Sequence, residues 1–316
     1  MSGKNLVQSS QSAGQELSRG RLAEGFSTFG VKTGDVLYVR AALRAVGAIE
    51  GSASETMIEA MRDVSGPNGT LVMPAFTRQY PIWQSDIPFV DEDRRVSTGA
   101  LAQALISRPD AIRSEHPTHS FVAVGARARE LMADHTLGCA CFEPMRRLAA
   151  SDAKMMLVGC IDQSPGFSTV HLAQHDLGLS QQHYIRFAFR VKIRGADREP
   201  VFVSLPEAPG CSRGFSRFYK DYEADGNKHR GFIGMADSML VGANRALQTE
   251  MSILAKNPTY PLCERETCVR CRILCGYNLS GAPRSLWLNL VRRGPAIVKH
   301  FARGGTANEI LQGKLR

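Results

Sequence analysis

The fold is decided by a short apolar stretch near the start of the chain, Gly34-Asp35-Val36-Leu37-Tyr38-Val39. Its apolar run after a Gly-Asp pair is typical of a buried strand. Residues 52–55, Ser-Ala-Ser-Glu, match the capping-box pattern, which predicts a helix reaching about Val64. Residues 70–73, Thr-Leu-Val-Met, then predict a second buried strand. A strand, a capped helix and another strand in succession indicate an α/β fold.

The same alternation continues toward the middle of the chain. Further strands are predicted at 121–125 and 154–159, and further helices at 15–29, 99–107, 126–134 and 168–177. Strands that alternate with helices favour a parallel or mixed sheet that helices cover on both faces. Between the second strand and the helix at 99–107 lies a long Pro-rich and aromatic loop, residues 75–96, and loops of this length are often functional.

The pattern changes after residue 183. Residues 184–193 alternate apolar with basic side chains, and residues 200–205 repeat the strand signal, which predicts an antiparallel hairpin. A long helix is expected from about Ile233 to Leu254. The predicted class is therefore α/β: a mixed central sheet flanked by helices on both faces, with an antiparallel β-hairpin insertion. We expect a flexible N-terminus at 1–14, a single domain at 15–283 and a basic amphipathic tail at 284–316.

The composition is that of an ordinary globular protein, with 43% hydrophobic and 22% charged residues in 316. No run approaches the roughly 20 apolar residues of a membrane-spanning helix, and the polar first residues show no signal-peptide core, so we expect a cytoplasmic protein. The net charge of +9 favours anionic partners. No aromatic-plus-basic motif accompanies it, and nucleic acid is not expected. The sequence does not determine the oligomeric state.

Four of the eight cysteines are crowded into thirteen residues: Cys263, Cys268, Cys271 and Cys275. In a cytoplasmic chain such crowding indicates a metal site or reduced thiols rather than disulfides. The spacing of the central pair suits structural zinc, and four close cysteines also fit an iron–sulfur cluster. Free thiols are the third possibility, and a zinc-bearing nucleic-acid binder is the least favoured reading of the chain.

The C-terminal tail mixes apolar with basic side chains from Ser285 to Arg303. Gly294-Pro295 is expected to break it into two short helices. A basic amphipathic segment that contains Trp287 either packs on the main domain or makes a peripheral contact with an anionic membrane surface.

An ordered set of motifs resembles the aminoglycoside 3-N-acetyltransferase family over roughly residues 28–275. The matching segments are residues 34–39, 47–51 (Gly-Ala-Ile-Glu-Gly), 69–74 (Gly-Thr-Leu-Val-Met-Pro), 113–120 (Arg-Ser-Glu-His-Pro-Thr-His-Ser) and 168–173 (Ser-Thr-Val-His-Leu-Ala). The resemblance implies an α/β N-acyltransferase that uses acetyl-CoA or another acyl-CoA. Its acceptor would be a small-molecule primary amine on an aminoglycoside, an amino sugar or a natural-product intermediate, and transfer would be direct, in a ternary complex.

The resemblance also implies the residues of the site. His171 is the catalytic histidine, and Gln174 stands where the family has a glutamate. The segment that holds the cofactor in the family, His-Ser-Ser after the first strand, is Arg40-Ala41-Ala42 here. The predicted cofactor-binding residues are Arg40, Ala41, Ala42, Leu43, Gly47, Gly51, Arg113, Ser114 and Ser120. The predicted substrate-binding residues are His116, His119, Phe76 and Asp176. The differences from the family at Gln174 and at residues 40–42 motivate an alternative, a catalytically attenuated member that binds a ligand or a partner.

The chemistry of amine acylation explains why a histidine is expected at position 171. The amine must lose a proton before it attacks the thioester, and imidazole titrates near neutrality. His171 is expected in the first turn of a helix that opens at Ser168, where the helix dipole disfavours the imidazolium. Gln174 can set the tautomer but carries no charge, and Asp176, Glu115 and Asp162 are the possible substitutes for the missing acid.

Overall fold

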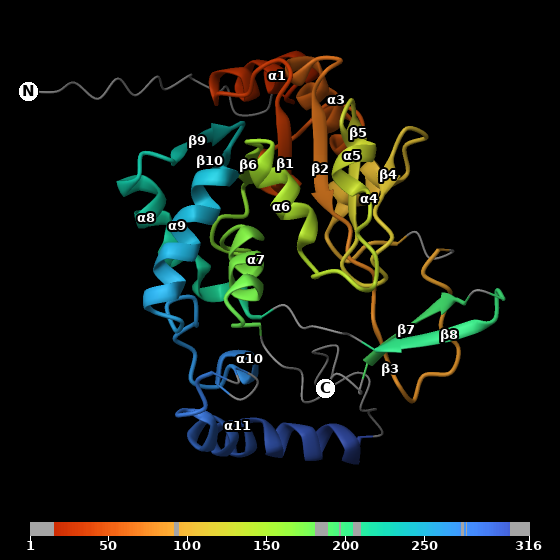
Figure 1. The fold of residues 1–316 in the computed structure, drawn as a ribbon, viewed down its shortest axis with the longest axis vertical. Helices are drawn as coiled ribbons and strands as arrows, with labels where there is room; N and C mark the ends of the chain where they lie inside the picture. Colours follow the sequence, from red (N-terminus) through yellow and green to blue (C-terminus); the bar gives the residue numbers. More distant parts are fainter. Residues whose placement is uncertain are drawn as a thin grey trace, which may run out of the picture.

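The structure is a computed structural model, which describes residues 16–91, 95–180, 189–195, 197–204, 210–272, 275 and 277–303. Within these residues a central sheet of seven strands has the order β4-β5-β2-β1-β6-β10-β9, and a smaller sheet has the order β3-β7-β8 (Figure 1). The strands of the central sheet are β1 (Val36–Ala41), β2 (Thr70–Pro74), β4 (Ile112–Arg113), β5 (Phe121–Gly125), β6 (Lys154–Val158), β9 (His229–Ile233) and β10 (Ala236–Gly242). The smaller sheet contains β3 (Tyr80–Pro81), β7 (Phe189–Arg194) and β8 (Pro200–Ser204).

The centre of the main sheet is parallel and its edges are antiparallel. Strand β1 pairs in parallel with β2 on one side and β6 on the other. Strand β5 runs antiparallel to β2, and β10 runs antiparallel to β6. The predicted mixed sheet is confirmed. The carboxyl ends of β1, β2 and β6 consequently lie along one edge of the sheet.

Helices cover both faces of the central sheet, as predicted, because each inner strand is apolar on both sides. In β1 the side chains of Leu37 and Val39 pack on one face, and that of Tyr38 packs on the other. Three helices lie on the first face: α1 (Arg19–Thr28), α3 (Ala53–Ser65) and α4 (Ala100–Ile106). The second face is covered by α5 (Ala128–Met132), α6 (Glu143–Ala150), α7 (Thr169–Asp176), α8 (Phe218–Ala224) and α9 (Ala243–Lys256). The short helix α2 (Leu43–Val46) follows β1 directly.

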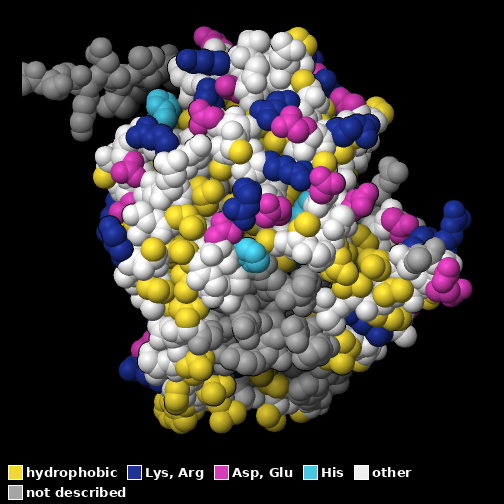
Figure 2. Space-filling model, in the orientation of Figure 1, with side chains coloured by type: hydrophobic (Ala, Val, Ile, Leu, Met, Phe, Trp, Pro, Cys, Tyr) yellow, Lys and Arg dark blue, Asp and Glu magenta, His cyan; other side chains and the backbone are white. Residues whose placement is uncertain are grey.

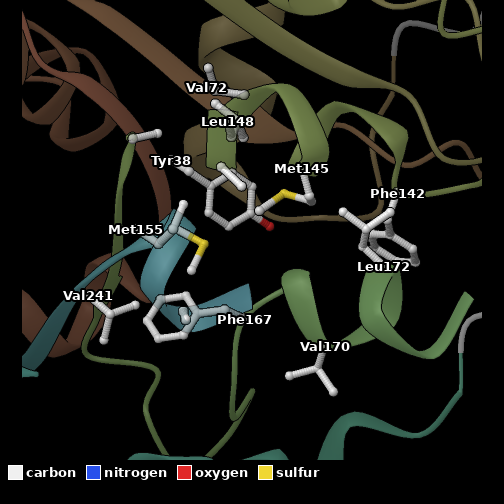
Figure 3. Packing of buried hydrophobic residues seen from close by; sticks show 14 of the residues in the cluster. Tyr38, Val72, Phe142, Met145, Leu148, Met155, Phe167, Val170, Leu172 and Val241 are labelled. Carbon is white, nitrogen blue, oxygen red and sulfur yellow. The ribbon is translucent and has the colours of Figure 1, made fainter. Parts of the chain in front are cut away.

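The core on the second face of the sheet contains the side chain of Tyr38, which is fully buried. Figure 3 shows its ring among Met145, Met155 and Leu148, with Phe142 and Leu172 farther along the same cluster. The Tyr38 hydroxyl ends this packing at a polar contact, since it lies 2.7 Å from the Oγ of Ser168. A buried hydroxyl needs such a partner, and here the partner is the N-cap residue of α7.

The helix expected from Ile233 to Leu254 is wrong over its first ten residues. Ile233 ends β9, and residues 236–242 form β10, so that only α9 is helical. Gly234 makes the turn with a φ of +58°, and a Cβ there would lie 2.4 Å from the carbonyl oxygen of Val46. Met239 and Val241 pack on one face of the sheet and Leu240 between them packs on the other, and this period of two belongs to a strand.

The predicted hairpin is present as β7 and β8, which pair antiparallel and stand apart from the main sheet (Figure 1). Residues 184–188 and Leu205 of the expected strands lie outside the described residues. The long loop 75–96 contributes β3 to this small sheet, and Phe89 bridges to Lys192. The loop therefore joins the hairpin to the main domain.

The C-terminal tail forms one helix, α11 (Ala282–Ala302), rather than the two that were expected. Pro295 lies inside it, and Gly294 before it has no Cβ to clash with the proline ring. Five large apolar side chains of α11 are exposed: Leu286, Trp287, Leu290, Val291 and Val298. Figure 2 shows apolar side chains gathered along the lower edge, where α11 lies in Figure 1. The peripheral membrane contact stays a prediction. None of the described helices is both long and apolar enough to cross a bilayer.

Candidate active site

A cavity of about 1060 Å³ opens at the carboxyl ends of the parallel strands. Its floor is made by Tyr38, Arg40 and Ala41 of β1, by Pro74 at the end of β2 and by Cys160 just beyond β6. Open α/β sheets bind their ligands at this edge. The cavity has the volume of a site for a large organic ligand.

Several chain segments build the walls of the cavity. They are the beginning of the long loop at residues 76–79, the residues 97–99 directly after the loop, the segment 164–168 before α7, the segment 210–215 and the pair Val269-Arg270. The segment Ser212–Arg217 is a 3-10 helix, and Val269 begins the short helix α10 (Val269–Arg272). Sequence reasoning gave no role to Tyr38, Phe142, Phe215 or Arg270, which all line the cavity, because no local pattern marks them.

His171 lies in the first turn of α7 and lines the cavity. Its Nδ1 lies 3.1 Å from the Oε1 of Gln174, one turn farther along the helix. The amide oxygen accepts a hydrogen bond from the Nδ1–H group, and this tautomer leaves a lone pair on Nε2. Burial lowers the pKa of His171 to about 4, and the bond to Gln174 offsets this only in part. The imidazole is therefore neutral at pH 7 and able to accept a proton.

Two aromatic rings fix the plane of the His171 imidazole. Phe142 stacks on it with ring centroids 4.7 Å apart, and Phe215 meets it at a steep angle with centroids 4.8 Å apart. Both rings are almost fully buried. The ring of the histidine is held on two sides, as a preorganised catalytic group requires.

The first turn of α7 is anchored by a buried polar network. Besides the contact between Tyr38 and Ser168, Thr169 donates a 2.7 Å hydrogen bond to Glu250 of α9. The hydroxyl of Tyr222 donates to the same carboxyl oxygen. Burial raises the pKa of Glu250 to about 8. This carboxyl is thus mostly protonated at neutral pH, and it ties α7 to α9 without placing a charge in the core.

Arg40 brings a positive charge to the floor of the cavity. Its guanidinium donates to the carbonyl oxygen of Gly166 at 2.9 Å and to that of Ser164 at 3.0 Å. These bonds hold the side chain along the segment that precedes α7. Arg270 also lines the cavity and is exposed to solvent. The arrangement suits a ligand that carries anionic groups.

The structure separates the two histidines that were predicted to bind substrate. His119 lines the cavity, where its ring lies 4.8 Å from that of Phe76, another predicted substrate contact. His116 lies behind the wall, 1% exposed, where its Nδ1 accepts the main-chain N–H of His119 at 3.0 Å. It stacks on His135 and closes a turn instead of facing the cavity.

Most of the residues predicted to bind the cofactor also lie outside the cavity wall. Arg40 and Ala41 line it, whereas Ala42, Leu43, Gly47, Gly51, Arg113, Ser114 and Ser120 do not. Arg113 is bonded to Ser120 and to the carbonyl oxygen of Ala75, and it supports the loop from behind. Ser114 is bonded to His135. Asp176 forms an ion pair with Arg146 at 2.7 Å and is likewise not part of the wall.

The cysteines assemble differently from the predicted set. Among the described residues, the Sγ atoms of Cys211, Cys263, Cys268 and Cys271 lie within 4.8 Å of one another. Cys275 is buried but does not belong to this group. Cys211 takes its place from the 210–215 wall of the cavity. The sequence offers no local signal for this, because Cys211 lies far from the crowded stretch.

Comparison with known proteins gives one family. The model of the family described as aminoglycoside 3-N-acetyltransferase matches residues 38–255. An aminoglycoside N(3)-acetyltransferase VII of Streptomyces paromomycinus is 30% identical over 255 residues, which is 72% of this chain and 88% of that one. A solved mutant of the acetyltransferase AAC(3)-IVa in complex with a gentamicin has a TM-score of 0.70 at 24% identity, covering 83% of this chain and 97% of its own. The AAC-IIIb complex with CoASH has a TM-score of 0.64 at 24% identity, covering 77% and 97%.

The buried histidines predict a loss of stability in mild acid. Burial lowers the pKa of His116 to about 3 and of His135 to about 4, and that of His119 well below its ordinary value. Unfolded histidines titrate near 6.5, so between pH 7 and 5 the unfolded chain takes up protons that the folded chain refuses. The free energy of unfolding should therefore decrease as the pH is lowered, by up to about 1.4 kcal/mol per pH unit for each such histidine.

Urea unfolding at a series of pH values measures this slope. His135→Gln should flatten it by about one proton, whereas His175→Gln, at an exposed position of α7, should leave it unchanged. If the unaltered protein, His135→Gln and His175→Gln all had the same slope, this would contradict the lowered pKa of His135.

Proposed function

The chain belongs to the aminoglycoside 3-N-acetyltransferase family and is an N-acetyltransferase, and we propose that His171 is the general base that activates its amine acceptor. The acetyl group passes directly from acetyl-CoA to a primary amine of an aminoglycoside or a related amino sugar. The observation that carries the proposal is the environment of His171. Its ring lines the cavity, Gln174 accepts from its Nδ1, and the pKa near 4 keeps Nε2 unprotonated.

The reaction needs one proton acceptor and one leaving group. The amine nitrogen attacks the thioester carbonyl, and Nε2 of His171 takes a proton from the nitrogen as the C–N bond forms. The C–S bond then breaks, and the coenzyme A thiolate leaves and takes up the proton that Nε2 accepted, which restores the neutral imidazole. Because both substrates meet at one histidine, the transfer requires them in the cavity together, as in a ternary complex.

With Gln174 as its partner, His171 is a weaker base than it would be beside a charged carboxylate. An anionic carboxylate beside Nδ1 stabilises the imidazolium that forms when Nε2 accepts a proton, whereas an amide only fixes the tautomer. The pKa of His171 near 4 is consistent with a site that lacks such an anion. We therefore expect turnover that is attenuated relative to a member with glutamate at this position.

Two arginines support acetyl-CoA as the donor. Arg40 on the floor and Arg270 on the wall bring positive charge to one cavity. The phosphates of coenzyme A are anionic, and the planar guanidinium matches phosphate geometry. We propose that these two side chains, with Ala41, hold the cofactor. The solved relative with CoASH supports the same donor.

The acceptor is proposed from the family and from the aromatic wall. The names of the relatives, and the gentamicin bound in one solved structure, favour an aminoglycoside. Phe76, His119 and Phe142 form a continuous aromatic surface near His171. We propose that a sugar ring lies on this surface, with its amine directed at Nε2 of His171.

Binding of acetyl-CoA is testable without knowledge of the acceptor. At about 100 times its Kd the cofactor should stabilise the protein by about 2.7 kcal/mol, which raises the Tm by roughly 5 °C. Arg270→Ala should reduce this rise by about half, because one phosphate contact is lost. Arg21→Ala, which removes an exposed charge on α1 and does not line the cavity, is the matched control and should keep the full rise. No rise at millimolar acetyl-CoA in the unaltered protein would contradict the proposal.

The weak base predicts a gain of function. Gln174→Glu places an anion beside Nδ1, raises the pKa of His171 and should increase kcat at least tenfold. The acid limb of the kcat/KM profile should move upward in pH with it. Gln174→Leu, whose side chain neither accepts a hydrogen bond from Nδ1 nor carries charge, should instead lower kcat. Free-thiol release from acetyl-CoA with a panel of aminoglycosides and amino sugars measures both. If Gln174→Glu folds, binds acetyl-CoA and is no faster, His171 is not limited by its partner.

A further inference from the structure

We infer that Cys211, Cys263, Cys268 and Cys271 bind one zinc ion that fastens two walls of the active-site cavity to each other. The four Sγ atoms all lie within 4.8 Å of one another. They come from two separate parts of the chain: Cys211 lies in the 210–215 wall, whereas Cys268 and Cys271 flank Val269 and Arg270 of the neighbouring wall and Cys263 precedes them in sequence.

The distances fit a single ion. Four thiolates placed tetrahedrally at about 2.3 Å from zinc lie about 3.8 Å from one another. The observed spread of up to 4.8 Å is close to this value and needs only small side-chain movements. An iron–sulfur cluster holds its thiolates on different iron atoms and so spaces them farther apart. The geometry therefore favours a mononuclear tetrathiolate site.

The surroundings suit thiolates as well. Cys263 directs its main-chain N–H at the Sγ of Cys271 over 3.5 Å, a bond that stabilises negative charge on sulfur. Arg265, Arg270 and Arg272 are interleaved with the cysteines. Arg272 also donates to the carbonyl oxygen of Cys263 at 3.0 Å. These cations offset the two negative charges that remain when four thiolates bind one Zn²⁺.

The position of the site links it to catalysis. Gly210 and Ser212, on either side of Cys211, line the cavity, and so does Phe215, whose ring lies 4.8 Å from that of His171. On the other side, Val269 and Arg270 lie between Cys268 and Cys271 and line the cavity too. The ion thus fixes the distance between the wall that orients His171 and the wall that carries Arg270.

Other contacts also join these segments, so that the ion supports the wall without being its only connection. Arg217 donates to the carbonyl oxygens of Tyr260 and Leu262 at 2.9 and 2.7 Å. A Cβ on Gly214 would lie 2.3 Å from the carbonyl oxygen of Pro261, which shows how closely the two stretches approach. Loss of the ion should accordingly loosen the cavity while the main domain stays folded.

The first test is metal content. The full chain, purified without chelator, should contain one zinc per chain by mass spectrometry, and X-ray absorption should show four sulfur atoms at about 2.3 Å. Cys211→Ser should lose most of the zinc, whereas Cys275→Ser should retain it. Cys211→His supplies another zinc ligand and should also retain it, with three sulfur atoms and one nitrogen. This measurement does not depend on acetyl transfer, so it stands or falls separately from the proposed function.

The second test is kinetic. Cys211→Ser should raise the KM for acetyl-CoA severalfold through the loosened Arg270 wall, and Cys211→His should restore it. The inference is overturned if the protein carries no stoichiometric zinc after exposure to Zn²⁺, or if it carries iron instead. It is equally overturned if Cys275→Ser loses as much zinc as Cys211→Ser.

Discussion

The parallel pairing of β1 with β2 and β6 is the constraint on which the site depends. It brings the carboxyl ends of three strands to one edge of the sheet, and the cavity opens at that edge. Since β1 is buried on both faces, its register cannot slip by one residue without exposing Leu37 and Val39 or burying them against the wrong helices. Arg40 and Ala41 therefore reach the cavity floor at fixed positions.

The same strand also positions His171. The Tyr38 hydroxyl meets Ser168 at the start of α7, and Thr169 meets the buried carboxyl of Glu250. Polar groups buried at this depth are costly when unpaired, so each contact strongly favours one placement of the helix. Phe142 and Phe215 then hold the imidazole itself. The imidazole is oriented by packing and by a neutral hydrogen bond, whereas its low pKa comes from burial.

Local patterns were enough to predict the inner strands, the helix that carries His171 and the covered mixed sheet, because apolar runs and period are properties of a few neighbouring residues. They failed where distant residues decide. The turn at Gly234 is set by its approach to Val46, and nothing in residues 233–242 alone excludes a helix. His116 and His119 are equally polar in the sequence, yet only His119 faces the cavity. The cluster of four thiols likewise contains Cys211 and not the predicted Cys275, because tertiary folding decides which cysteines meet.

His171 is proposed to accept the proton of the acceptor amine. The direct measurement is kcat/KM for thiol release from acetyl-CoA, in the presence of an aminoglycoside that the unaltered protein acetylates, for His171→Ala and His175→Ala. General-base catalysis contributes about 10² to 10⁴ in rate, so His171→Ala should lose at least a hundredfold while its Tm still rises with acetyl-CoA. His175→Ala, four residues farther along α7 and outside the cavity wall, should stay within about twofold. A His171→Ala protein that keeps its activity would contradict the account.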